Sequence, residues 1–376
     1  MTSIINNLEN SVNMKNKKLV SILVSALILS AFCFMFFYEK NDKIKVGVIA
    51  PLTGKGAYYG QILKTNFDLA FASESLYELK YEDSKFEKNA SISAINKLIT
   101  VDKVPVILGE VTSDNTLTIA PIAEKNKTVL FATIASADKL SEVGEYFFRN
   151  VPSNNIQGIT AANFIHTKLG INSVAVFGQN SEYGVNITTS FKNEYTKLGG
   201  KVVFDDSFLE GEVNFKTQLQ KVKQSGAEAL YIPGNENEPA MILKQAKEIG
   251  LSIPIVGGDG SSTDNLITMA GAGSEGFYIT NIVINKNSEF YKNYRDMFYE
   301  KFGKEPSAYD AYAYEGAKII LAALKGAGNK AEDVKKYLHS NSFPSMTGDL
   351  TFDEKGQVKR QWGIYQVVNG KFVELD

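Results

Sequence analysis

The amino-acid sequence predicts an α/β protein with two lobes, each built on a parallel sheet. Three observations predict this fold. The chain has 376 residues, which is more than one small domain usually contains. Short strands rich in β-branched residues alternate with amphipathic helices in two separate series, as in parallel sheets covered by helices. The segments after the second series must join lobes already begun, so several linkers should cross between the lobes.

The first series covers residues 44–134. Its opening strand, residues 44–50, is short, apolar and β-branched. The helix that follows places Leu63, Phe67 and Phe71 on one face, as a helix packed on a sheet requires. The remaining elements repeat the alternation, with strands expected at 77–83, 104–109 and 128–134 and helices at 89–100 and 114–126.

The second series begins after residue 152 and follows the same alternation. A Gly-Gly pair ends its second helix, and Phe215, Leu219 and Val222 lie at helical spacing in its third. We expect strands at 173–178, 201–208, 229–234 and 254–260 and helices at 156–168, 183–200 and 237–250. The chain then continues with a strand near 275–283, helices at 288–302, 309–325 and 331–340, and an alternating segment at 348–375 that predicts antiparallel hairpins around Asn369-Gly370.

Composition and charge exclude several classes of function. The chain carries 40 basic and 42 acidic residues, and a net charge of −2 attracts neither nucleic acid nor anionic lipid. Only three of the basic residues are arginines, too few for a phosphate-reading surface. One cysteine and two distant histidines, His166 and His339, provide no zinc or iron–sulfur motif and no nucleophile–base pair. We therefore expect no catalytic residue, metal or cofactor, and a protein that is not an enzyme.

The N-terminal region predicts export. Residues 1–18 form a lysine-containing n-region, and the 20 residues of 19–38 carry no charge. As a helix, this run would span about 30 Å, one hydrocarbon core. The lysines would hold the N-terminus in the cytoplasm and send the rest of the chain outside. Translation starts either at Met1 or at Met14, which precedes the lysines of a signal-like segment.

Three fates of the apolar run stay open. It forms an uncleaved membrane anchor, it belongs to a lipoprotein modified at Cys33, or it is a cleaved signal peptide. The residues before Cys33 resemble a lipobox, but Phe32 stands where that motif has a small residue. All three fates export residues 40–376, and a single cysteine suits an exported protein that folds without disulfides.

Polar side chains collect in the loops that follow the predicted strands. In open α/β sheets, ligands bind at the carboxyl ends of the strands. Glycine, hydroxyl, amide, carboxylate and tyrosine groups are concentrated in the loops at 51–61, 110–113, 135–138, 179–184, 233–239 and 258–263. Ordinary turn and cap chemistry favours the same residue types, so no single loop is diagnostic. Six such loops on two facing lobes indicate a ligand site between the lobes.

The glycines of the first loop do not form a dinucleotide site. Gly54, Gly56 and Gly60 approximate the G-x-G-x-x-G fingerprint, but the last glycine comes one residue late. Tyr59 stands in its place and would crowd a pyrophosphate. The sequence also contains no P-loop.

Several segments together resemble the type 1 periplasmic binding proteins of the leucine/isoleucine/valine-binding family, which are extracytoplasmic receptors of ABC importers. They include "IKVGVIAPLTGKGAYYG", "FGQNSEYG", "GGDG" and "PSAYDAYAYEGAKIILAALK". The resemblance covers residues 44–370 in order. It implies two Rossmann-like lobes joined by a three-strand hinge, with an amino acid bound between them. The implied lobes are residues 44–151 with 283–345 and residues 152–282 with 346–376.

The resemblance also implies which residues bind the amino acid. The family's carboxylate-binding serine matches Ser113. Its next carboxylate contact, a backbone amide and a hydroxyl, matches Ile134 and Ser136. The acid that pairs with the ammonium group matches Asp259.

The side chain of the ligand would face residues that depart from the family pattern. The aromatic walls of the family's site match Tyr59, Tyr183 and Tyr309. A family tyrosine in the second lobe falls on Asn235, and Thr133 with Ile134 replaces the usual small Pro-Ala pair. An aliphatic preference is therefore not implied, and the "NENE" segment that begins at Asn235 would favour a more polar side chain.

The chemistry of an α-amino acid agrees with this assignment. A carboxylate suits a helix N-terminus, where free backbone N–H groups and the helix dipole favour an anion. A charge-assisted hydrogen bond from Ser113 would add about 1.5–3 kcal/mol. An ammonium group needs a carboxylate partner when buried, and Asp259 follows a strand of the other lobe. One ligand would therefore bridge both lobes and favour their closure.

The sequence thus predicts an extracytoplasmic binding protein that captures an amino acid, branched-chain or related, and passes it to ABC permease subunits. We expect a monomer with no nucleic-acid partner, held at the membrane by residues 19–38 or released by cleavage. Two alternatives stay open. One is a ligand-sensing module of the same fold that acts through a signalling partner, and the other is a binder of small amides or other small polar ligands.

Overall fold

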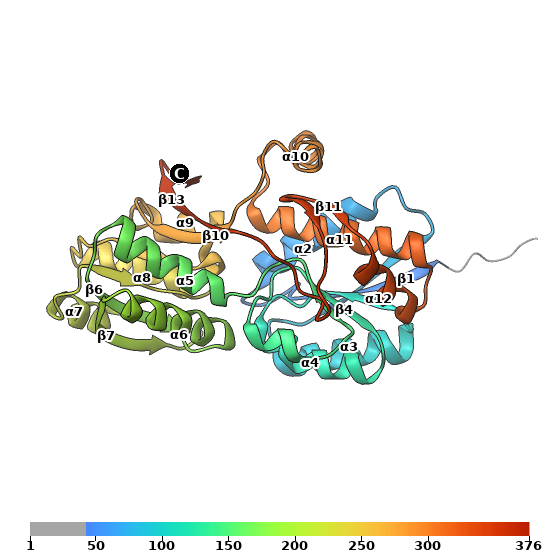
Figure 1. Ribbon diagram of the computed structural model, residues 1–376, viewed down its shortest axis with the longest axis horizontal. Coiled ribbons are helices and arrows are strands. Elements are labelled where there is room, and N and C mark those ends of the chain that lie inside the picture. Colours follow the sequence, from blue (N-terminus) through green and yellow to red (C-terminus); the bar gives the residue numbers. More distant parts are fainter. Residues whose placement is uncertain (1–42, 376) are drawn as a thin grey trace, which may run out of the picture. The chain divides into compact units, whose positions relative to one another are not determined.

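A computed structural model describes residues 43–375, and all of these except Lys43 belong to one compact unit that begins at Ile44 (Figure 1). The predicted export segment, including Cys33, lies outside the described residues. Within residues 43–375, no helix is both long and apolar enough to cross a membrane.

The first sheet consists of five parallel strands in the order β2-β1-β3-β4-β5. Their bounds are Ile44–Ala50 (β1), Tyr77–Asp83 (β2), Val106–Leu108 (β3), Val129–Ala132 (β4) and Phe147–Arg149 (β5). All but the edge strand β2 are largely buried, because helices cover both faces. The four strands predicted in the first series are confirmed, two of them with shorter ends.

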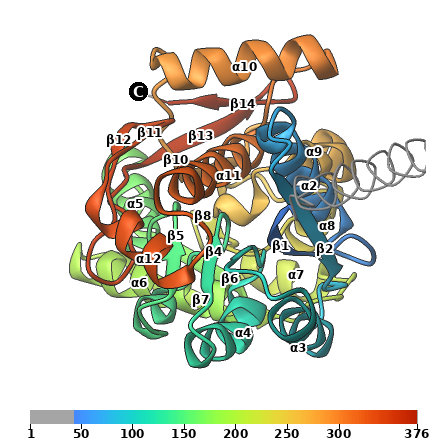
Figure 2. The ribbon, with the colours of Figure 1, turned by 90° about the vertical axis from the view of Figure 1, so that its right-hand side faces the viewer.

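Helices cover both faces of this sheet (Figure 2). Successive side chains of each strand point to opposite faces, so each strand packs against both groups of helices. In β4, Val129 and Phe131 point to one face, and Leu130 and Ala132 point to the other. One face is covered by α2 (Ala57–Phe71), α11 (Ala308–Ala327) and α12 (Ala331–Ser340), and the opposite face by α3 (Lys88–Lys97) and α4 (Ser113–Lys125). The late helices α11 and α12 therefore pack on the sheet of the first lobe.

The second sheet has the strand order β14-β13-β10-β9-β8-β6-β7 and is parallel from β7 to β10. Its strands are β6 (Ser173–Gln179), β7 (Lys201–Phe208), β8 (Ala229–Tyr231), β9 (Ile255–Gly257), β10 (Tyr278–Ile282), β13 (Trp362–Val368) and β14 (Lys371–Glu374). The last two strands pair antiparallel. Asn369 and Gly370 join them with φ values of 52° and 70°, which confirms the predicted two-residue hairpin turn.

Helices also cover both faces of the second sheet. One face packs against α5 (Asn155–Asn163) and α6 (Glu182–Lys197), and the other against α7 (Lys216–Gln224), α8 (Asn237–Glu248) and α9 (Asp264–Ala270). The amphipathic spacing of Phe215, Leu219 and Val222 is explained here, because all three are buried in one apolar cluster with β6 and β8.

Within residues 44–375, the chain passes between the two sheets three times. It does so between β5 and α5, between β10 and α10 (Glu289–Phe302), and between the hairpin β11–β12 (Phe343–Ser345, Gly348–Leu350) and β13. The connections touch one another. Val283 N donates to Gln361 O at 2.9 Å, and Arg149 N donates to Gly356 O at 3.1 Å. The structure therefore has the two-lobe architecture with a three-strand hinge that the sequence predicted.

A buried ion pair ties this hinge to the first lobe. Glu315 of α11 pairs with Arg360 of the third connection, and both side chains are fully buried. Glu315 also accepts a hydrogen bond from Asn150 Nδ2 in the first connection, at 2.9 Å. Two of the three connections are thus fixed to the same helix.

Candidate ligand-binding site

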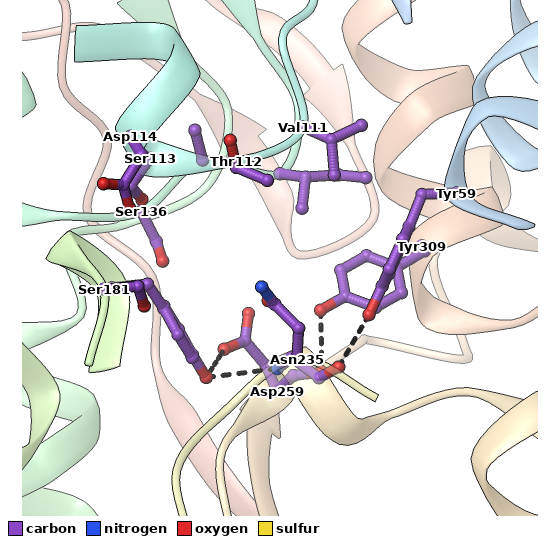
Figure 3. Close-up of a pocket in the computed structure, with 14 residues that line it drawn as sticks. Tyr59, Val111, Thr112, Ser113, Asp114, Ser136, Ser181, Asn235, Asp259 and Tyr309 are labelled. Atoms are coloured by element: carbon purple, nitrogen blue, oxygen red, sulfur yellow. Dashed lines mark hydrogen bonds between the residues drawn. The ribbon is translucent and has the colours of Figure 1, made fainter. Parts of the chain in front are cut away.

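A cavity lies between the carboxyl ends of the two sets of strands (Figure 3). The eight residues predicted from the sequence all line it, namely Tyr59, Ser113, Ile134, Ser136, Tyr183, Asn235, Asp259 and Tyr309. They come from seven separate segments, and none is adjacent in sequence to another. Parallel strands bring these segments to one edge of each sheet, which is why loops far apart in the chain converge here.

One side of the cavity is formed by the N-terminus of α4. Thr112 is the N-cap, and its hydroxyl accepts the backbone N–H of Asn115 at 3.1 Å. Ser113 is therefore not needed as the cap. Its Oγ accepts the N–H of Ala137 at 3.1 Å, which leaves the hydroxyl hydrogen to be donated into the cavity. The helix dipole adds to the preference for an anion at this end.

The loop after β4 completes this side. Ile134 and Ser136 are both buried, and the carbonyl of Ser136 accepts the N–H of Asn154 at 2.9 Å. The Ser136 hydroxyl lines the cavity next to Ser113 (Figure 3). Two hydroxyls and a helix terminus thus face the same part of the cavity, without a carboxylate acceptor of their own among the described residues.

A buried arginine that the sequence analysis did not select supports this loop from behind. Arg149 is fully buried, and its guanidinium donates to Ala137 O (2.9 Å), Ser141 Oγ (3.1 Å) and Gln357 Oε1 (2.5 Å). It makes no ion pair with any described acid. Burial lowers the pKa of Arg149 to about 10, so the group stays cationic at neutral pH. A fixed positive charge therefore stands behind the loop that carries Ser136.

The opposite side of the cavity carries Asp259, in a short turn after β9. Its Oδ1 accepts from Gln157 Nε2 and from the hydroxyl of Tyr183, each at 2.8 Å. Its Oδ2 has no hydrogen-bond donor among the described residues and faces the cavity (Figure 3). Burial raises the pKa of Asp259 above its ordinary value, and the hydrogen bonds from Gln157, Tyr183 and the nearby backbone offset only part of that rise. This oxygen can accept from a cation.

Two tyrosines from the first lobe reach across to the second. The hydroxyl of Tyr59 donates to Gly260 O at 2.8 Å, and that of Tyr309 donates to Asp259 O at 2.7 Å. Their rings meet edge to face with centroids 5.7 Å apart. Burial raises the pKa of each hydroxyl well above its ordinary value, so both remain donors at neutral pH. Two of the three predicted aromatic walls, Tyr59 and Tyr309, are therefore also contacts between the lobes.

Polar contacts around the rim join the same two lobes. Glu182 N donates to Asp114 Oδ2 at 3.0 Å, and Asp138 N donates to Asn186 Oδ1 at 3.1 Å. Lys139 also pairs with Glu182 at 2.8 Å. The N-termini of α4 and α6 thus meet at the edge of the cavity, and the lobes are closed against each other in this structure.

Two supporting residues, Gln157 and Arg149, were not among the residues predicted from the sequence. Gln157 lies 102 positions from Asp259, and nothing in its local sequence marks it. Arg149 did carry a signal, because a charged residue inside the apolar run "FFR" of a buried strand is unusual. Among residues 43–375 there is no cluster of His, Cys, Asp and Glu that could hold a metal ion.

Comparisons with known proteins match nearly the whole described chain. The sequence pattern of the family described as "Periplasmic binding protein" matches residues 43–371. The leucine-, isoleucine-, valine-, threonine- and alanine-binding protein of Pseudomonas aeruginosa is 27% identical over 356 residues, which cover 92% of this chain and 94% of that protein. The Leu/Ile/Val-binding protein of Escherichia coli K12 is 27% identical over 354 residues, covering 91% and 95%.

Solved structures agree with the sequence matches. The leucine-binding protein LivK of Thermotoga maritima superposes with a TM-score of 0.85 at 29% identity, covering 89% of this chain and 98% of that one. The branched-chain amino-acid transporter substrate-binding protein LivJ of Streptococcus pneumoniae, solved with isoleucine, gives a TM-score of 0.82 at 27% identity, covering 89% and 100%.

Proposed function

The chain belongs to the type 1 periplasmic binding proteins of the leucine/isoleucine/valine-binding family, and from this premise we propose that it captures an α-amino acid between its lobes and delivers it to an ABC importer. The observation that carries the proposal is that one lobe offers groups that favour an anion and the other lobe offers a group that favours a cation. Ser113 and Ser136 offer hydroxyls beside a helix N-terminus on one lobe, and Asp259 offers an unshared carboxylate oxygen on the other.

In this proposal the first lobe holds the carboxylate of the ligand. The hydroxyls of Ser113 and Ser136, the backbone amide of Ile134 and the amides that begin α4 would donate to it. Each charge-assisted hydrogen bond would contribute about 1.5–3 kcal/mol. Arg149 would add favourable electrostatics from behind the loop without touching the ligand.

The second lobe would hold the ammonium group. Asp259 Oδ2 accepts from it, while Gln157 and Tyr183 keep the carboxylate in place through Oδ1. Tyr59, Tyr183 and Tyr309 form walls around the α-carbon, and Asn235 faces the side chain. A ligand that contacts both lobes binds the closed state better than the open state, so it shifts the population toward closure. The closed, ligand-bound state is then the form that a permease would recognise.

The relatives are binding proteins, and we propose that this protein likewise performs no chemistry. It would act outside the cytoplasm as a monomer. Residues 19–38 would anchor it or direct its export, and Cys33 is the residue that a lipoprotein would carry its lipid on. The resemblance implies lobes of residues 44–151 with 283–345 and residues 152–282 with 346–376. We propose a later last boundary, because Leu350, Phe352 and Val358 are buried in the apolar cluster of the first lobe and the chain enters the second sheet only at β13.

A thermal-shift screen of the purified protein tests this function directly. The ligands are the L-amino acids, small amides and small organic acids. A ligand present at 100 times its Kd stabilises the folded state by about 2.7 kcal/mol. We expect at least one L-amino acid to raise the melting temperature. A screen in which only amides or organic acids stabilise the protein would contradict the proposal.

A further inference from the structure

One wall of the cavity has side chains that hold neither charged group of an amino acid in this proposal, and these side chains are polar. The residues of this wall are Thr112, Asp114, Ser181 and Asn235. Once the carboxylate is assigned to the α4 terminus and the ammonium to Asp259, the side chain of the ligand is left to face this wall, the ring of Tyr59 and Val111.

Asn235 is the residue of this wall that is best placed to bind. Its backbone N–H donates to Gln179 Oε1 at 2.9 Å, which fixes its position after β8. Its side-chain amide makes no hydrogen bond with any described residue and extends into the cavity beside Asp259 (Figure 3). A half-buried amide with unused donors and acceptor can pair with a polar group of a ligand.

The hydroxyls on this wall also have a donor to spare. Thr112 Oγ1 accepts the N–H of Asn115 and Ser181 Oγ accepts the N–H of Gly184, each at 3.1 Å, because both residues are helix caps. A hydroxyl that accepts a cap hydrogen bond still has its own hydrogen to donate. The wall therefore presents both donors and acceptors to the cavity.

The charged member of the wall is already neutralised by neighbours. Asp114 Oδ1 pairs with Lys88 at 3.3 Å, and its Oδ2 accepts the N–H of Glu182 at 3.0 Å. A cationic side chain of a ligand would thus find no free carboxylate here. The same four wall residues also line a neighbouring hollow, whose other lining residues are polar or charged except for Phe86.

We propose, on the basis of the function above, that the bound amino acid has a short uncharged side chain with a hydrogen-bonding group, and that Asn235 selects it. Threonine, serine, asparagine and glutamine are of this class. An aliphatic side chain would cover the Asn235 amide without pairing with it, and a polar group left unpaired on binding lowers affinity by about 10- to 100-fold.

Calorimetric titration of wild-type protein and of Asn235→Leu with threonine, asparagine, glutamine, leucine and isoleucine tests the proposal. We expect a polar amino acid to bind wild type at least about 10-fold more tightly than leucine, and Asn235→Leu to abolish or reverse this preference. Asn235→Ser, which keeps a hydrogen-bonding group, should retain it. Asn237→Leu, two positions away and outside the cavity, should leave the ranking unchanged.

The outcomes separate this inference from the proposed function. Leucine or isoleucine as the tightest ligand of wild type, or an unchanged ranking in Asn235→Leu, would overturn the side-chain inference and leave amino-acid capture intact. Failure of every amino acid to bind a protein with a normal melting curve would overturn both. A variant that melts at lower temperature is replaced by Asn235→Ser, for which loss of the polar preference would count against the proposal.

Discussion

Asp259→Asn is the substitution that separates ligand binding from folding most cleanly. The new amide is nearly the same size as the carboxyl group. Its oxygen can still accept from Gln157 and Tyr183, so the local hydrogen bonds at Oδ1 are retained. The change falls on Oδ2, where an N–H donor would replace the oxygen that faces the ammonium group.

The size of the effect follows from the pair that is broken. Removing one partner of a buried, hydrogen-bonded charge pair costs about 2–5 kcal/mol of binding free energy. Each 1.4 kcal/mol is a factor of ten, so the Kd should rise about 30-fold to several thousand-fold. The unliganded protein should lose no stability at neutral pH, since burial already raises the pKa of Asp259 and disfavours its charged form.

The assay is calorimetric titration of wild type and Asp259→Asn with the same amino acid, together with melting curves without ligand. Asp264→Asn is the matched control, because Asp264 is an exposed acid in the same lobe, five positions away. We expect the Asp264→Asn variant to bind the amino acid as tightly as wild type. An Asp259→Asn variant whose Kd stays within threefold of wild type would refute the assignment of the ammonium partner.

Three further predictions concern pH, the carboxylate half of the site and the hinge. Affinity for the amino acid should fall as the pH drops through the raised pKa of Asp259, because only the carboxylate form pairs with an ammonium group. Titrations between pH 4 and 8 should show this loss of affinity starting above the usual carboxyl range. The affinity of Asp259→Asn should not change with pH over the same range. Ser113→Ala should weaken binding about 10- to 150-fold, because one charge-assisted hydrogen bond to the ligand is lost. It should lower the free energy of unfolding by only about 1 kcal/mol, since Thr112 caps the helix. Equal affinity of variant and wild type by calorimetry would contradict the role of Ser113. Glu315→Ala should cost about 3–5 kcal/mol in urea unfolding, because it leaves Arg360 buried without its partner; a loss below about 1 kcal/mol would show that the pair does not stabilise the hinge.

Most of the fold could be predicted because its signals are local. Strands such as β1 and β4 are short apolar runs, and helices such as α4 and α11 have an apolar face and a capping residue in the sequence. The late helices could be assigned to the first lobe only by resemblance. Their partners on β1, β3 and β4 lie more than 150 residues earlier, and no local pattern encodes such a pairing.

The residues of the candidate site could be predicted only in part from the local sequence. Ser113 and Asp259 each lie in a polar loop after a predicted strand, but their roles in ligand binding were implied only by the family resemblance. The interlobe hydrogen bonds of Tyr59 and Tyr309 could not be predicted from the sequence, since they depend on how the lobes close. Gln157 was also missed, because its function comes only from a partner brought near by the fold.

The most direct test of the account is calorimetric titration with a matched ligand set in which one charge is removed at a time. The set contains the tightest-binding L-amino acid, its carboxamide and its des-amino acid. We predict that only the zwitterion binds tightly, since the α4 terminus needs the carboxylate and Asp259 needs the ammonium group. Equal affinity for either singly charged analogue would contradict it.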